Sequence, residues 1–324
     1  MLQRLNAQLP DWARPGHPAV RHVLGAPSAA NRRLLILQFV AGIVLMTVST
    51  VGVLVMQAQV QAEPEIRPLS ATVISALYVP ALVGQLLLSV LVVIYSSNHI
   101  NTERRSRTWD TLRVTSGGVG ITLRARWGAA IFYRLSGFVI VLLLVRVLLI
   151  ALLVYDVSAF GGDYLPLAAG GGVEPALPIP ASLLLVSLYM AASLILPLTG
   201  LGLEAAIGLL LSTFLRNRIF LLLAQVVYGV ARVALSFGLI YLLDRNTNIL
   251  TMPSTIAAWL TMVAHGAFAD WGLRTLNLDY ASELWAMVQY GIFVGAGLLV
   301  LAFAQAVLAD GLVWWAVRRA ETRE

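Results

Sequence analysis

Six apolar runs, each long enough to cross a membrane as a helix, divide this chain of 324 residues. The first, Leu34–Met56, holds 23 residues. As a helix it reaches about 35 Å, more than a hydrocarbon core of about 30 Å. Because lipid offers no partner to backbone polar groups, such runs fold as helices. The expected spans are 34–56, 72–96, 128–155, 181–214, 219–243 and 284–308.

These runs predict an all-α polytopic membrane protein with six transmembrane helices. The transmembrane domain would cover residues 34–317, between an N-terminal segment at 1–33 and a tail at 318–324. The composition agrees, since 59% of the residues are apolar and only 12% are charged.

Arginine is unevenly distributed along the chain. With the N-terminus inside, four inner segments hold sixteen arginines: 1–33, 98–126, 216–218 and 318–323. The outer loops hold three, and the remaining three, Arg134, Arg146 and Arg232, lie within spans. Because cytoplasmic loops carry the excess of positive charge, we expect both termini to be cytoplasmic. The same topology explains the net charge of +6, so we expect no nucleic-acid partner.

Several kinds of chemistry are excluded by composition. The chain has no cysteine, which excludes disulfides and thiolate ligands. It also has no lysine, so it can form neither a P-loop nor a Schiff base. The four histidines are scattered, and neither HExxH nor GxSxG occurs. We therefore expect no enzyme, metal site or cofactor in this chain, and any ATP it uses must be hydrolysed by another chain.

Three stretches depart from a plain pattern of spans and loops. Ala19–Ala26 predicts a short amphipathic helix on the membrane surface, with an ordered tail as the alternative. The fourth run is overlong, and Pro197 and two glycines near its middle predict a tilt, kink or break. Ile256–Phe268 is apolar but has only 13 residues, which predicts an interfacial or re-entrant helix in the outer loop between spans five and six. Four acids of that loop are expected to be solvated: Asp244, Asp270, Asp279 and Glu283.

Glu204 and Arg232 form the most informative polar pair within the spans. Counted from the turn at 216–218, they lie about 18 Å and about 21 Å deep on adjacent antiparallel helices. An ion pair is therefore expected. Three roles remain open for it: fixing helix packing, lining a translocation path, or relaying protons.

The segment Asn98–Arg126 is the longest strongly charged stretch between two apolar runs. If it is helical, Glu103 and Arg107 form an i,i+4 pair, while Trp109 and Leu112 share one face. An aromatic residue ringed by charges suits docking into a groove on a soluble partner. The alternative is a juxtamembrane loop that contacts anionic lipid.

This segment resembles the cytoplasmic motif E-x-x-x-GTLE-x-LL-x-TP of the ABC-2 type transporter permease family. The positions that fit are Glu103, Thr108, Asp110 (in place of Glu), Leu112 and Thr115, whereas Arg107, Trp109, Arg113 and Ser116 depart from it. Ala206–Arg218 is similar to the family's fourth span with its short basic turn. More faintly, His17–Gly25 resembles the family's N-terminal surface helix.

The resemblance implies the membrane-spanning subunit of an ABC exporter in a bacterial plasma membrane. It would pair with a second permease protomer, identical or not, and with ATPase subunits that carry ATP and Mg²⁺. The docking residues of the coupling helix would be Glu103, Arg107, Thr108, Trp109, Asp110, Leu112 and Thr115. The outer helix at Ile256–Phe268 would help form an exit gate. The alternatives are a non-transporting subunit that anchors a larger membrane complex and a lipid-modifying enzyme.

Overall fold

The structure is a computed structural model. It describes residues 29–60, 69–105, 118–159, 177–215, 217–245, 254–277 and 288–322, together with residues 10, 12, 14, 21, 280, 281 and 285. All regular secondary structure in these ranges is helical.

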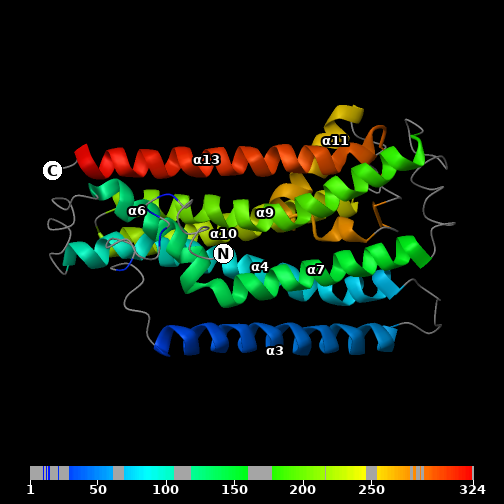
Figure 1. Ribbon diagram of the computed structural model, residues 1–324, viewed down its shortest axis with the longest axis horizontal. Coiled ribbons are helices and arrows are strands. Elements are labelled where there is room, and N and C mark those ends of the chain that lie inside the picture. Colours follow the sequence, from blue (N-terminus) through cyan, green and yellow to red (C-terminus); the bar gives the residue numbers. More distant parts are fainter. Residues whose placement is uncertain are drawn as a thin grey trace.

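Six helices are long and apolar enough to cross a membrane. They are α3 (Ala29–Val60), α4 (Leu69–Arg105), α7 (Ser136–Ala159), α9 (Ile179–Phe214), α10 (Arg218–Arg245) and α13 (Val294–Thr322). Successive long helices run in opposite directions, with α3 at one edge of the bundle (Figure 1). The predicted all-helical fold with six long apolar helices is confirmed, and the chain is a multi-pass membrane protein.

The boundaries of two spans differ from those predicted. The third begins at Ser136, after a short helix, α6 (Gly118–Ala129), and the π-helical turn η2 (Ala130–Arg134). The sixth was expected at 284–308 but begins with the turn η6 (Gly291–Phe293) and continues to Thr322. Tyr290 explains the later start, because its left-handed backbone (φ 62°) interrupts any right-handed helix that approaches from the N-terminal side.

Helix α9 lies at the centre of the bundle and packs along its length against α13, with α4 on another side. It is one continuous helix in spite of Pro197. The crossing with α13 is close at Gly295, where an added Cβ would lie 2.9 Å from the backbone N of Tyr189. Glycine at 295 therefore serves packing within the chain.

Between α10 and η6, the chain folds into the bundle as what we term the inserted segment, residues 254–277. It contains α11 (Thr255–Ala264), the π-helical turn η4 (His265–Ala269) and the 3-10 turn η5 (Arg274–Leu276). Ser254 starts α11 by accepting a hydrogen bond from the backbone N–H of Ala257. Helix α11 and η4 thus cover the stretch in which the sequence predicts a short non-spanning helix. They pack against α10 and α13.

Most of the predicted docking residues lie outside the described residues: Arg107, Thr108, Trp109, Asp110, Leu112 and Thr115. Glu103 lies in the last turn of α4. Residues 19–26 are likewise outside the described part of the chain, apart from Arg21.

Candidate functional site

The inserted segment reverses direction deep in the bundle, at two residues with left-handed backbone, Trp271 (φ 52°) and Gly272 (φ 72°). Asp270 holds this turn closed. Its two carboxylate oxygens accept hydrogen bonds from the backbone N–H of Gly272 (3.0 Å) and of Arg274 (2.8 Å). The expectation that Asp270 is solvated is therefore wrong, since it is 1% exposed. Its carboxylate is buried because it satisfies the N–H groups of the turn. Of the other three acids, Asp279 and Glu283 lie outside the described residues, and Asp244 lies in the last turn of α10.

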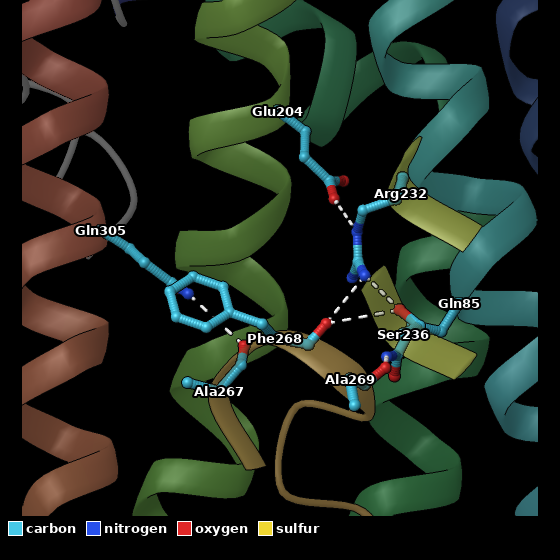
Figure 2. A network of polar contacts seen from close by, with 8 residues as sticks. All are labelled: Gln85, Glu204, Arg232, Ser236, Ala267, Phe268, Ala269 and Gln305. Carbon is cyan, nitrogen blue, oxygen red and sulfur yellow. Dashed lines mark hydrogen bonds and ion pairs between the residues drawn. The ribbon is translucent and has the colours of Figure 1, made fainter. Parts of the chain in front are cut away.

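The C-terminal end of η4 is a buried helix end, whose last carbonyls cannot bond within the helix. Side chains from three long helices donate to them. Gln305 of α13 donates to Ala267 O (3.4 Å), Arg232 of α10 to Phe268 O (2.7 Å) and Gln85 of α4 to Ala269 O (3.3 Å). Figure 2 shows these donors converging on the end of the segment. We call this arrangement the polar seat of the inserted segment.

Arg146 of α7 completes the polar seat. Its guanidinium donates to Trp271 O (2.7 Å), to Asp270 O (3.1 Å) and to the Gln85 side-chain oxygen (2.9 Å). The side chain is fully buried. Two arginines thus lie at the negative end of a helix dipole, where positive charge is favourable.

A fourth hydrogen bond from Arg146 explains how α9 tolerates its internal proline. Pro197 has no N–H, so the carbonyl four residues earlier, that of Ser193, lacks its helical partner. Arg146 donates to this carbonyl at 2.8 Å. One guanidinium therefore replaces the missing donor in α9 and also caps the inserted segment.

Glu204 and Arg232 meet at the depth that the sequence predicts. Arg232 Nε lies 2.9 Å from Glu204 Oε1, and the two side chains are 7% and 6% exposed. Arg232 also donates to Ser236 of its own helix, and its guanidinium lies 5.6 Å from the Trp271 ring centroid. The ion pair therefore links α9 to α10 and, through Arg232, also links both helices to the inserted segment (Figure 2).

The polar seat lies near the middle of the spans. Arg146 is about 15 Å from the start of α7 at Ser136, and Gln85 is about 18 Å from the start of the apolar span at Val73. Irregular backbone at such depth occurs in membrane proteins only where protein or a water-filled cavity surrounds it. The two acids and two arginines of this region, Glu204, Asp270, Arg146 and Arg232, cancel in formal charge.

Helix α9 has glycines where tryptophans of other elements pack against it. The ring of Trp271 packs on Gly200, where an added Cβ would lie 2.8 Å from two of its atoms. Two residues further along α9, the indole N–H of Trp127 in α6 donates to Gly202 O at 2.7 Å. The two glycines near the middle of the fourth span are thus contact points for tryptophans from other elements.

Sequence reasoning singled out the ion pair but assigned no role to Arg146, Gln85 or Gln305. The available signals were the isolated glutamines within apolar runs and the proline that frees a carbonyl.

Within the described ranges, no three His, Asp or Glu side chains come together as a metal site. Comparison with protein-family models, with curated proteins and with solved structures found no match to this chain.

Proposed function

We propose that this chain is the membrane-spanning permease subunit of an ABC-2 type exporter. It works with a second permease protomer and is driven by ATPase subunits that dock on the segment 98–126. The polar seat carries the proposal. A helix that only rested on the membrane surface would need an apolar face alone, whereas η4 and the turn that follows it depend on donors from four different spans. A relative shift of those spans would release the inserted segment. This is how a gate across a transport path would behave.

The connection between the docking segment and the polar seat supports the same function. Segment 98–126 joins α4 to the elements that lead into α7, and these two helices carry Gln85 and Arg146. A rigid displacement of the segment by ATP-driven closure of the ATPases would therefore move two of the four capping helices. Such a displacement biases packing between two discrete arrangements.

The proposed orientation puts the docking segment in the cytoplasm. Helices α3, α7 and α10 begin, and α4, α9 and α13 end, at one end of the bundle (Figure 1). This end, which we call the arginine-rich end, carries among others Arg33, Arg126, Arg218 and Arg318. By the positive-inside rule it faces the cytoplasm.

The docking step is tested by co-purification from native membranes. The double variant Trp109→Ala, Asp110→Asn should lose most of the co-purifying ATPase, because removal of a central tryptophan contact costs about 2 kcal/mol or more, roughly 30-fold in affinity. Trp314→Ala is the matched control, since Trp314 is an exposed tryptophan (48%) near the C-terminal end of α13. Unchanged association and unchanged stimulation of ATP hydrolysis in the double variant would refute the docking assignment. A native complex that holds a fixed membrane assembly and no ABC ATPase would support the anchoring alternative instead.

A further inference from the structure

A cavity of about 170 Å³ lies between α3, α4 and α7. Its floor is buried and its rim is open, since Met46 and Leu88 are 9% and 3% exposed whereas Leu45 and Leu87 are 48% and 52% exposed. Glycines or apolar side chains form the whole lining: Gly42, Leu45, Met46, Gly84, Leu87, Leu88, Leu91, Phe138, Val141 and Leu142. The cavity therefore opens sideways, towards the lipid.

The apolar lining of the cavity suits a lipid tail better than water. A buried water needs two to four polar partners, and the lining offers none from its side chains. Empty apolar space forfeits dispersion contacts that a dense interior would make. In a chain surrounded by bilayer, the group that reaches such a cavity through exposed leucines is an acyl chain.

A polar cluster closes the cavity on the side of the arginine-rich end. Each of its three members lies four residues from a lining residue: Tyr95 after Leu91, Gln38 before Gly42 and Arg134 before Phe138. The Arg134 guanidinium lies 6.0 Å from the Tyr95 ring centroid, and the Gln38 amide donates to Arg134 O at 2.7 Å. We call these three residues the headgroup cluster.

The headgroup cluster has unused capacity for an anion and for a donor. Among the described residues, no carboxylate pairs with Arg134. The side-chain oxygen of Gln38 is buried and accepts no hydrogen bond there. Gln38 itself is only 8% exposed. A phosphate would satisfy the arginine, and a hydroxyl of the same headgroup would satisfy the glutamine.

We propose that this cavity and the headgroup cluster form a binding site for one bilayer phospholipid with an anionic phosphodiester headgroup that carries hydroxyls, as in phosphatidylglycerol. Its phosphate lies on Arg134 and one acyl chain fills the cavity. The dimensions agree. Tyr95 and Gly84 are about 16 Å apart along α4, close to half of a hydrocarbon core of about 30 Å. The site lies on the lipid-facing side of α3, α4 and α7, and it does not depend on the proposed transport function.

The headgroup arm of the test uses full-length protein in phosphatidylcholine vesicles that contain photoactivatable phosphatidylglycerol. Crosslinking to residues 84–91 is measured after digestion. Arg134→Gln should lower it roughly fivefold, equivalent to about 1 kcal/mol for one cation at the membrane surface. Arg218→Gln is the matched control, because Arg218 is an exposed arginine at the same end of the bundle. An equal fall in both variants would show diffuse attraction to anionic lipid and would overturn the proposal.

The acyl-chain arm of the test blocks the cavity with a tryptophan side chain. Leu87→Trp should abolish the crosslink, whereas Leu148→Trp should not, since Leu148 is equally exposed (50%) on α7 but does not line the cavity. Thermal stability of each variant in detergent shows whether the protein is folded. Lipid extracted from purified wild-type protein should also contain retained phosphatidylglycerol. Wild-type crosslinking equal to that of Leu87→Trp would refute the site. The vesicles contain no amphiphile besides these two phospholipids, so a positive result assigns the ligand to the bilayer and not to a transported molecule.

Discussion

Replacing Arg146 with glutamine should unseat the inserted segment and destabilise the protein. The arginine makes four hydrogen bonds, to Ser193 O, Trp271 O, Asp270 O and the Gln85 side chain. Glutamine has a shorter side chain whose amide carries two N–H donors, so at least two of the four acceptors lose their arginine donor. Each of them is buried, where no water replaces the lost donor.

The magnitude follows from the number of lost bonds. Side-chain hydrogen bonds in membrane proteins average about 0.6 kcal/mol, and an unsatisfied buried acceptor costs about 1–3 kcal/mol. Two lost bonds therefore destabilise by about 1 kcal/mol at the low end and by several kcal/mol at the high end. Arg146→Lys keeps the positive charge and three donors, although it lacks the planar fork of arginine. It should therefore lower the free energy of unfolding by less than Arg146→Gln does.

A second substitution tests the hydrogen bond from Arg146 to Ser193 O. Pro197→Ala restores an N–H that can bond to Ser193 O within α9, so it supplies one of the acceptors that Arg146→Gln leaves unpaired. The double variant Arg146→Gln, Pro197→Ala should therefore recover about 1 kcal/mol relative to the sum of the two single effects. Pro180→Ala is the control proline variant, because Pro180 lies in the first turn of α9, where no helical donor is missing.

The assay is reversible unfolding in mixed micelles, together with hydrogen exchange of residues 265–277. Faster exchange should be confined to this stretch in Arg146→Gln and should slow again only in part in the double variant, because Pro197→Ala does not restore the arginine donor to the inserted segment. If the free energies of unfolding of the two single variants simply add, within about 0.3–0.5 kcal/mol, Arg146 does not replace the donor missing at Pro197.

Three further predictions follow from other contacts. Exchanging Glu204 and Arg232 should recover at least about 1 kcal/mol of the 3–5 kcal/mol lost by each single charge reversal, and no recovery in a double-mutant cycle would exclude the pair. Gly295→Val should lower thermal stability through its clash with the backbone of α9, by about 1–3 kcal/mol, whereas Gly311→Val, with no atom within 4 Å of its added Cβ, should not. Asp270→Ala should speed amide exchange at Gly272, because its carboxylate accepts that N–H, and unchanged exchange would contradict this role.

The features that could be read from the sequence are those set by length and local composition. The long spans follow from runs of apolar residues, and the short helix at α11 follows from a run too brief to cross the membrane. The meeting of Glu204 with Arg232 follows from equal depth on neighbouring helices. The spans and the short helix need no knowledge of which spans touch. The ion pair also needs its two helices to be neighbours, while a helix of known rise fixes the depth of each residue by counting.

The polar seat could not be read in the same way, because its acceptors are backbone carbonyls. Every residue has one, so the sequence does not mark the carbonyls of Ala267 or Phe268 as unpaired. The turn at Trp271 and Gly272 and the left-handed backbone of Tyr290 are also invisible in an apolar pattern, which explains the misplaced start of the sixth span. Asp270 was assigned to solvent because its loop position was considered without the N–H groups of the turn that follows it.

The proline in α9 and the inserted segment are best understood as one unit. A proline alone would leave Ser193 O unpaired in the core, and a buried helix end alone would leave its carbonyls unpaired. Arg146 satisfies acceptors of both kinds, Ser193 O in α9 and Trp271 O in the inserted segment, and these partners compensate the cost of burying its charge. Withdrawal of the inserted segment would therefore leave a buried cation with half of its partners. We infer that the inserted segment moves together with α7, which ties its position to the helix that follows the proposed docking segment.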